Sequence, residues 1–177
     1  MQTLYQNNDI RIRPYYEVEA QQIYTAVSAS LLELQLFMLW VTENYTLIDT
    51  KAWLQKSVVS WQQGTWYGFV IEDVKTGLFL GDVGLKVIDR LHQQAILGYW
   101  IHSEFTGRGI AIMAIKLLME FAKEQLQLKK FKVEIAANNV KIIALIQKFS
   151  VRLCNIKANT EYIAEQMLDY NIYQLDL

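Results

Sequence analysis

Gly107 and Gly109 lie one residue apart in a short loop, and this spacing could bind a phosphate. The loop, residues 106–111, joins a strand-like run at 95–102 to a helical pattern that continues to about residue 124. Closely spaced glycines allow a sharp turn that directs several N–H groups to one point. A helix start adds unpaired N–H groups and a positive dipole end. Tight packing without a ligand is the alternative, since a bare G-x-G is a weak signal.

Two other phosphate-binding motifs are excluded by spacing. A Walker loop requires G-x-x-x-x-G-K-S/T, and the chain contains no such run. A dinucleotide-binding fingerprint requires a small residue at position 112, where the chain has Ile112, and a strand that opens a βαβ unit. The strand before this loop lies instead in the middle of the chain.

The loop and its flanks resemble the acyl-coenzyme A site of the GNAT acyltransferase superfamily, whose pattern is Q/R-x-x-G-x-G/A. Residues 106–111 match this pattern except at Thr106. The branch that acetylates the N-termini of ribosomal proteins carries further motifs that this chain shares. These are I-x-I-R-P at 10–14, G-Y-W at 98–100, Asn139, E-Y at 161–162 and D-x-N-x-Y at 169–173. The resemblance therefore covers nearly the whole chain.

The resemblance implies an α/β fold with a mixed, mostly antiparallel sheet flanked by helices, in which the fourth and fifth strands splay apart. Acetyl-coenzyme A is the implied cosubstrate, with its pantetheine arm in the gap between those strands. An amide-bearing arm can bond to unpaired strand backbone there, like an added strand. The implied coenzyme contacts are the main chain of Trp100, Ile101 and His102, the pyrophosphate-binding residues Gly107, Arg108, Gly109, Ile110 and Ala111, and Asn139 on the pantetheine arm.

The resemblance also implies the residues on the acceptor side. Glu161 matches the position of the branch's basic glutamate, which would take a proton from the attacking ammonium. A solvated turn carboxylate is the alternative interpretation of Glu161. Trp40 is the best-placed aromatic contact for the acceptor, while aromatic residues at such spacing more often belong to the core. The other candidates for this wall are Trp53, Trp61 and Trp66.

The acid side of the motif is missing from this chain. The branch usually places a serine three residues after the asparagine, where it can bond the coenzyme sulfur, and other superfamily members use a tyrosine seven residues after it. Here those positions are Ile142 and Ile146, and neither can donate a proton. A thiol is itself a fair leaving group with a pKa near 8.5, so the loss weakens catalysis and does not forbid it.

The leading functional hypothesis is an N-acetyltransferase that moves acetyl from acetyl-coenzyme A to a primary amine by direct attack in a ternary complex. A protein N-terminal α-amine is the leading acceptor. A small amine such as a polyamine or an aminoglycoside is the first alternative, and a strongly acidic acceptor cleft would favour it. A catalytically degenerate acyl-coenzyme A-binding module is the second alternative.

Composition limits the class of protein further. The 177 residues are 53% hydrophobic, which predicts a single domain over residues 1–177. Lys and Arg total 17 against 18 Asp and Glu, so a nucleic-acid partner is not expected. Apolar runs such as 36–41 are too short for a membrane span. We expect a monomer or a homodimer.

A single cysteine, Cys154, rules out a disulfide within the chain and favours a cytoplasmic location. Cys154 is predicted to fill the core. With only His92 and His102 beside one cysteine, no zinc site is expected.

Hydrophobic periodicity predicts the elements that position these residues. The helices are predicted at 17–39 as one or two segments, from a cap at Asp49 or Thr50 to Gln63, after the glycine loop, and at 140–149. The strands are predicted at 66–72, 78–87, 94–102, 131–136 and 167–175, after a first strand at 10–14. The strands from 66 to 102 form an antiparallel meander.

Overall fold

A computed structural model of the chain describes residues 4–15, 19–163 and 166–177. The helices are α1 (Ala20–Ala29), α2 (Leu31–Leu34), α3 (Leu47–Gln63), the short 3-10 helix η2 (Ser103–Phe105), α4 (Ile110–Leu126) and α5 (Val140–Ile146). The strands are β1 (Tyr5–Gln6), β2 (Ile10–Pro14), β3 (Trp66–Asp73), β4 (Phe79–Asp89), β5 (Gln94–Ile101), β6 (Lys130–Ala136), β7 (Val151–Ile163) and β8 (Gln166–Asp176).

The strands form one mixed sheet in the order β1-β2-β3-β4-β5-β6-β8-β7. Neighbouring strands are antiparallel except β5 and β6, which are parallel. A parallel pair needs a long crossover, which α4 supplies between β5 and β6. This confirms the predicted fold class and the meander from β3 to β5.

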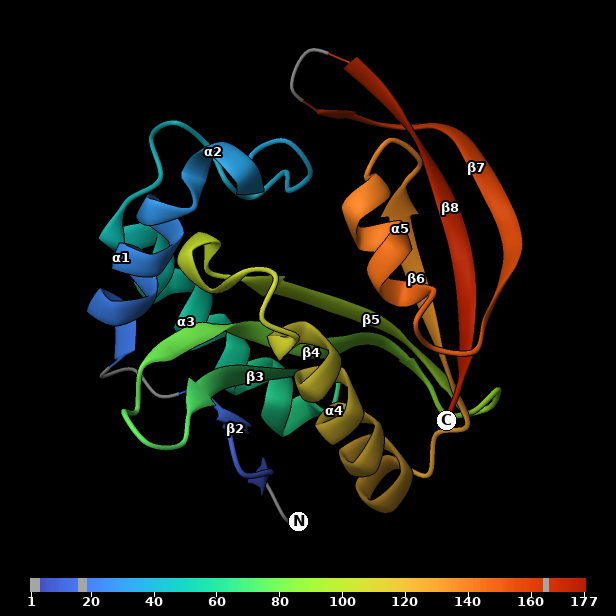
Figure 1. Ribbon diagram of the computed structural model, residues 1–177, viewed down its shortest axis with the longest axis horizontal. Coiled ribbons are helices and arrows are strands. Elements are labelled where there is room, and N and C mark those ends of the chain that lie inside the picture. Colours follow the sequence, from blue (N-terminus) through green and yellow to red (C-terminus); the bar gives the residue numbers. More distant parts are fainter. Residues whose placement is uncertain (1–3, 16–18, 164–165) are drawn as a thin grey trace.

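The strands β5 and β6 pair over only part of their length. Register is kept from Gln94 opposite Lys130 to Leu97 opposite Val133, and then it ends. Figure 1 shows the two strands close together near the C-terminus and diverging toward α5 and the η2 loop. They correspond to the fourth and fifth strands of the resemblance once the two-residue β1 is set aside. The predicted splay is therefore present.

The helix α4 forms because its apolar residues recur at helical spacing and cover one face of the sheet. The residues Ala111, Ala114, Ile115, Leu118, Phe121 and Ala122 are all buried, as the sequence predicts. All of them except Ala111 belong to one cluster with Phe69 and Ile71 of β3, whereas Val70 packs with α1 and α3 in a second cluster. Because successive strand residues point to opposite faces, the two clusters lie on opposite sides of the sheet.

The start of α3 differs from the prediction. The helix begins at Leu47, and Thr46 is its N-cap, where Asp49 or Thr50 was expected. Asp49 is instead the third helical residue of a capping box, and its carboxylate accepts a hydrogen bond from the Thr46 N–H (2.8 Å). Asp49 therefore stabilises the first turn of α3 from within the helix and is not its cap.

The strand β7 was not predicted, and Cys154 lies on it. Residues 152–160 of this edge strand are exposed, so the sequence carries no alternation of apolar and polar side chains there. Cys154 is exposed as well, so its prediction as a core residue is wrong. Among the described helices, none is both long enough and apolar enough to cross a lipid bilayer.

Phe121→Ala should lower the free energy of unfolding by about 3–5 kcal/mol, measured by urea denaturation. The Phe121 ring is fully buried and contacts the rings of Tyr5 (6.0 Å between centroids), Trp61 (5.9 Å) and Phe69 (4.9 Å). The matched control is Lys116→Ala on the exposed face of α4, which should change stability by less than about 0.5 kcal/mol. Equal effects of the two substitutions would contradict this packing.

Candidate active site

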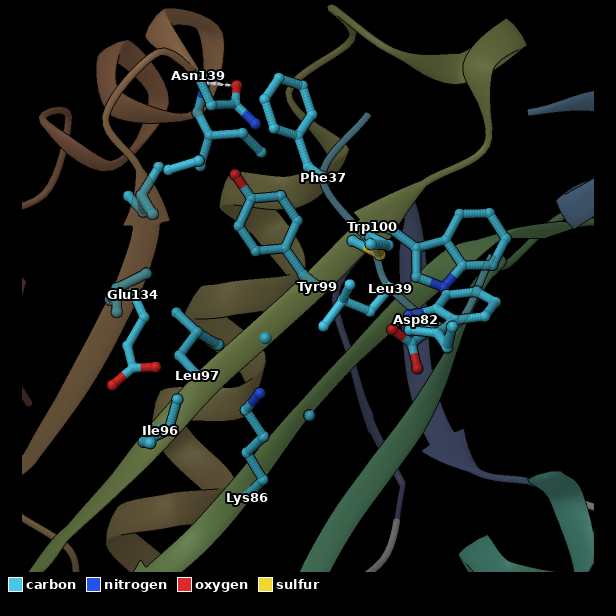
Figure 2. A pocket seen from close by; sticks show the side chains of 18 of the residues that line it. Phe37, Leu39, Asp82, Lys86, Ile96, Leu97, Tyr99, Trp100, Glu134 and Asn139 are labelled. Atoms are coloured by element: carbon cyan, nitrogen blue, oxygen red, sulfur yellow. Dashed lines mark hydrogen bonds between the residues drawn. The ribbon is translucent and has the colours of Figure 1, made fainter. Parts of the chain in front are cut away.

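A cavity of about 390 Å³ opens where β5 and β6 diverge. Its walls come from the segment after α2, from α3, from β3 to β6, from the start of α5 and from the β7–β8 hairpin. Figure 2 shows several of its side chains, with Asn139 and Tyr99 at one end and Asp82 beside Trp100 at the other. The cavity thus combines residues that are distant in the sequence.

The glycine loop forms the predicted anion-binding geometry. Gly107 and Gly109 have φ angles of 77° and 78°, which a glycine adopts without strain. A Cβ added to either would meet nothing within 4 Å, so the space above the loop is open. Gly109 is the N-cap of α4, and no side chain caps this helix start. The first N–H groups of α4 have no acceptor within the helix and remain available to an anion.

The rest of the loop leaves mainly its backbone to a ligand. The side chains of Ile110 and Ala111 are buried in the core beneath the loop. Arg108 is exposed, and its guanidinium donates to the Glu104 carbonyl (3.0 Å) and lies 5.2 Å from the centroid of the Phe105 ring. These contacts hold a positive charge beside the open N–H groups.

The backbone of β5 presents alternate residues to its two neighbours. The N–H of His102 donates to the Leu80 carbonyl (2.9 Å), and the His102 carbonyl accepts from the N–H three residues later (2.9 Å). Both main-chain groups of His102 thus have partners within the protein, and its contact with the coenzyme stays a prediction. The main-chain N–H and C=O groups of successive strand residues point to alternate neighbours. Those of Trp100 therefore also point toward β4, whereas those of Tyr99 and Ile101 point into the gap toward β6.

Asn139 is the N-cap of α5 and lines the cavity. Its Oδ1 accepts a hydrogen bond from the Ile142 N–H (3.2 Å), drawn as a dashed line in Figure 2. The side-chain NH₂ group has no acceptor among the residues that the structure describes, so it remains free to donate. Asn139 thus serves the helix and leaves a donor for a ligand.

The two positions that lack an acid differ in their surroundings. Ile142 lines the cavity, so a side chain at this position does face the candidate site. Ile146 is fully buried in the main core cluster and does not line the cavity. An acid at position 142 could therefore reach a ligand in the cavity, and Ile142 supplies none.

Glu161 reaches the cavity from β7, next to a shift of register between Lys157 and Glu161. Its Oε2 accepts a hydrogen bond from the hydroxyl of Tyr170 on β8 (2.9 Å). Burial, helped by this bond, raises the pKa of Tyr170 above its ordinary value, which keeps the phenol protonated as a donor. Glu161 is thus a half-buried, oriented carboxylate on a strand, and the interpretation as a solvated turn residue does not describe it.

Asp82 is a cavity carboxylate that the sequence analysis missed. It lies on β4 opposite Trp100 of β5, and the hydroxyl of Tyr15 donates to its Oδ2. Burial raises the pKa of Asp82 to about 7, and the Tyr15 hydrogen bond acts in the opposite direction. The only sequence signal is an acid within the apolar run 79–85. Its carboxyl group can change charge near neutral pH.

Three of the four predicted tryptophans line the cavity. Trp40 is 45% exposed and lies at its rim, while the rings of Trp53 and Trp66 meet edge to face at 5.4 Å. Trp61 does not line the cavity, because it packs against Phe69 in the core (4.9 Å). The cavity therefore has an aromatic wall without Trp61, and the contact of this wall with an acceptor stays a prediction.

The charges along the cavity are mixed. Its carboxylates are Asp82, Glu134 and Glu161, and Lys86 lies among them. Glu134 forms an ion pair with Lys157 (2.9 Å), which offsets its charge. Among the described residues, no three His, Cys, Asp or Glu side chains are grouped so as to hold a metal ion. The cavity is aromatic and weakly acidic.

The chain is similar in sequence to known acetyltransferases. Residues 9–151 match the family model described as acetyltransferase (GNAT) domain. The ribosomal-protein-serine acetyltransferase of Escherichia coli (strain K12) is 22% identical over 174 residues, which are 97% of this chain and 95% of that protein. YdaF of Bacillus subtilis (strain 168) is 33% identical over 72 residues, so the match spans 41% of this chain and 39% of YdaF.

The same fold occurs in a solved structure of RimL, the ribosomal L7/L12 α-N-protein acetyltransferase, in complex with coenzyme A. The TM-score is 0.92 at 18% sequence identity, and the match covers 98% of each chain. At this identity the likeness establishes the fold alone. With the family match over most of its length, its splayed strands and its glycine loop before α4, the chain belongs to the GNAT acetyltransferase family.

Proposed function

We propose that the protein transfers acetyl from acetyl-coenzyme A to a protein N-terminal α-amine. The observation that carries this proposal is the cavity between β5 and β6, which contains unpaired strand backbone, three carboxylates and an aromatic wall. The names of the relatives, which acetylate ribosomal proteins, support the same class of acceptor. A cytoplasmic location is proposed with it.

The coenzyme would be held by main-chain groups along its length. The N–H groups at the start of α4, with Gly107, Arg108 and Gly109, would bind the pyrophosphate. The main-chain groups of Ile101 and the NH₂ group of Asn139 would bind the pantetheine arm. The open space above both loop glycines and the unpaired helix start fit an anionic ligand of this kind.

The acceptor would lie among the tryptophans, with its ammonium group near Asp82. A half-buried carboxylate whose partner is a neutral phenol can be stabilised by a cation, and an α-ammonium group supplies one. Trp40 would contact the chain that carries the amine. The alternative acceptor, a polyamine or an aminoglycoside, would favour a strongly acidic cleft, and Lys86 and the ion pair of Glu134 make this cavity only weakly acidic.

Acetyl transfer from the thioester to the amine requires the protein to hold the two reactants together and to remove a proton from the ammonium. Glu161 would take this proton, oriented by the hydroxyl of Tyr170. The neutral amine would then attack the thioester carbonyl directly, without a covalent enzyme intermediate. Because Ile142 lines the cavity without a donor, a catalytically degenerate binding module is the competing proposal.

An acetylation screen tests this function. The purified protein is incubated with acetyl-coenzyme A and with peptides bearing free N-termini, N-terminally blocked peptides, polyamines or aminoglycosides. Released free coenzyme A is the readout, and mass spectrometry locates the acetyl group. We expect release with free N-termini and none with blocked ones. Binding of acetyl-coenzyme A without release in any arm would favour the degenerate module, and acetylation of polyamines alone would identify a small-amine enzyme.

Gly109→Val should abolish coenzyme A binding measured by calorimetry. A β-branched side chain resists a φ of 78° and would fill the space in front of the free N–H groups. The matched control is Gly77→Val in the β3–β4 turn, where φ is 70° and nothing lies within 4 Å of an added Cβ. The control should carry the same backbone strain and bind normally. Unchanged affinity in folded Gly109→Val would contradict the assignment of the loop.

Glu161→Gln should lower kcat by about 100-fold and leave coenzyme A affinity unchanged, because it removes the proton acceptor but keeps the shape of the side chain. Tyr170→Phe should have a smaller effect of about 3- to 10-fold, since it removes only the orienting hydrogen bond (2.9 Å). Full turnover in Glu161→Gln would assign the proton to water or to another group.

Asp82→Asn should raise KM for the acceptor by about 10- to 100-fold with little change in kcat, since it removes the charge that binds the ammonium. The pKa of Asp82 is raised to about 7, so its carboxylate is charged above that pH and neutral below it. In the unsubstituted protein, KM for the acceptor should therefore rise as pH falls through 7. This rise should be absent from Asp82→Asn. The same pH dependence in both proteins would show that Asp82 does not bind the acceptor.

A further inference from the structure

The hydroxyl group of Tyr99 is buried and has no hydrogen-bond partner among the residues that the structure describes. Leaving a buried polar group unpaired costs about 1–3 kcal/mol, so such groups are rare in folded proteins. Every other phenol of the candidate site is paired, since Tyr15 bonds to Asp82 and Tyr170 bonds to Glu161. The Tyr99 hydroxyl therefore needs a partner that the described residues do not supply.

The position of Tyr99 indicates which ligand could supply this partner. Tyr99 lies on β5 beyond Leu97, the last residue paired with β6, so its main-chain groups face the gap. Its side chain lines the cavity together with Asn139 and Ile142. In Figure 2 the ring rises from β5 toward the end of the cavity where Asn139 lies. A coenzyme arm in the gap would pass this hydroxyl.

The same end of the cavity lacks the donor that the chemistry needs. When an amine displaces a thioester sulfur, the carbon–sulfur bond breaks and both of its electrons go to sulfur. A hydrogen-bond donor beside that sulfur stabilises the transition state. The residues at the usual donor positions are Ile142, which lines the cavity, and Ile146, which is buried in the core. The NH₂ group of Asn139 would bind the pantetheine arm, and Tyr99 is a second neutral donor at this end of the cavity.

We propose that the Tyr99 hydroxyl donates a hydrogen bond to the coenzyme sulfur and so performs the task of the missing donor on α5. This inference rests on the proposed binding of acetyl-coenzyme A in the gap between β5 and β6. In the reaction, the neutral amine, which has already given one proton to Glu161, forms its bond to the acetyl carbon, and its nitrogen then releases a second proton to solvent. The sulfur leaves with the bonding electrons, stabilised by Tyr99, and later takes a proton from solvent.

The environment of Tyr99 makes it a hydrogen-bond donor and a poor source of protons. Burial raises the pKa of the Tyr99 phenol above its ordinary value of about 10. A thiol has a pKa near 8.5, so transfer of the phenol proton to the leaving thiolate is unfavourable. The proton therefore stays on Tyr99, and the hydrogen bond remains available through successive turnovers.

Coenzyme A binding as a function of pH tests the proposal without any acceptor. A donor beside the sulfur favours the thiolate form and so lowers the pKa of the bound thiol. The affinity of the unsubstituted protein for coenzyme A should therefore rise as pH increases toward about 8.5 and level off above it. Acetyl-coenzyme A, whose sulfur carries no proton, corrects for other groups that titrate in this range. The rise in coenzyme A affinity with pH, divided by the change seen with acetyl-coenzyme A, should be about 5- to 100-fold smaller in Tyr99→Phe. Calorimetry between about pH 7 and 10 measures the affinities of each protein for coenzyme A and for acetyl-coenzyme A.

The matched control is Tyr173→Phe. Tyr173 is buried in the same core cluster as Tyr99 but does not line the cavity, so the control should leave the pH dependence unchanged. Tyr99→Phe should fold with equal or higher thermal stability, because it removes a hydroxyl that finds no partner in the described part of the chain. A clear loss of stability would mean that the hydroxyl is already bonded and would overturn the proposal.

Kinetics with a rescue variant gives a second test. Tyr99→Phe should lower kcat by about 5- to 100-fold and leave KM for the acceptor unchanged. Adding Ile142→Ser should restore part of this loss, because it returns a hydroxyl to the same end of the cavity. Ile142→Ser alone should raise kcat less than it does in the Tyr99→Phe background, since one donor is already present. Activities are compared at a temperature at which all variants are folded.

The outcomes separate this inference from the proposed function. If the unsubstituted protein binds neither coenzyme A nor acetyl-coenzyme A, the proposed function fails and this inference fails with it. If both bind and Tyr99→Phe shows the same pH dependence and the same kcat as the unsubstituted protein, the role of Tyr99 alone is overturned. If the pH dependence and kcat change together and Ile142→Ser restores kcat, the proposal is supported.

Discussion

The short pairing between β5 and β6 is the constraint on which the rest of the site depends. Their register ends at Leu97 and Val133, while β6 stays paired with β8 along its whole length, from Lys130 to Ala136. The strand β6 is therefore held in the second half of the sheet and cannot close onto β5. Strand backbone that would normally be paired is left facing a cavity, and a ligand with amide groups can satisfy it.

The splay also sets the chemical character of each side of the cavity. Successive residues of β5 point to opposite faces, so Trp100 joins the aromatic residues near Asp82 while Tyr99 packs on the α4 side. The carboxylates and tryptophans thus gather where an amine would enter. The glycine loop, Asn139 and the phenol of Tyr99 gather where a coenzyme would lie.

Burial decides how the ionisable groups of this site behave. Asp82 is half-buried in a cavity that tryptophans line, and among the described residues its hydrogen-bond partner is the phenol of Tyr15, so its carboxyl group can change charge near neutral pH. Tyr99 and Tyr170 are held as neutral donors for the same reason. A site that has lost the usual donor on α5 therefore still contains protonated phenols at neutral pH. The chemistry depends on the packing around these residues as well as on their types.

The sequence alone determined the features that depend on neighbouring residues in the chain. The apolar spacing of α4, the alternation of the central strands and the paired glycines before the helix are local, so they predicted the helix, the meander and the loop correctly. The splay followed only from the resemblance to the family. The start of α3, the exposed strand β7 and the position of Cys154 lacked a clear local signal and were missed or wrong. The backbone bonds of His102, the pKa of Asp82 and the unpaired hydroxyl of Tyr99 were decided only by the tertiary structure. Each depends on groups that distant segments bring within a few ångströms, and no local pattern of residues specifies those contacts.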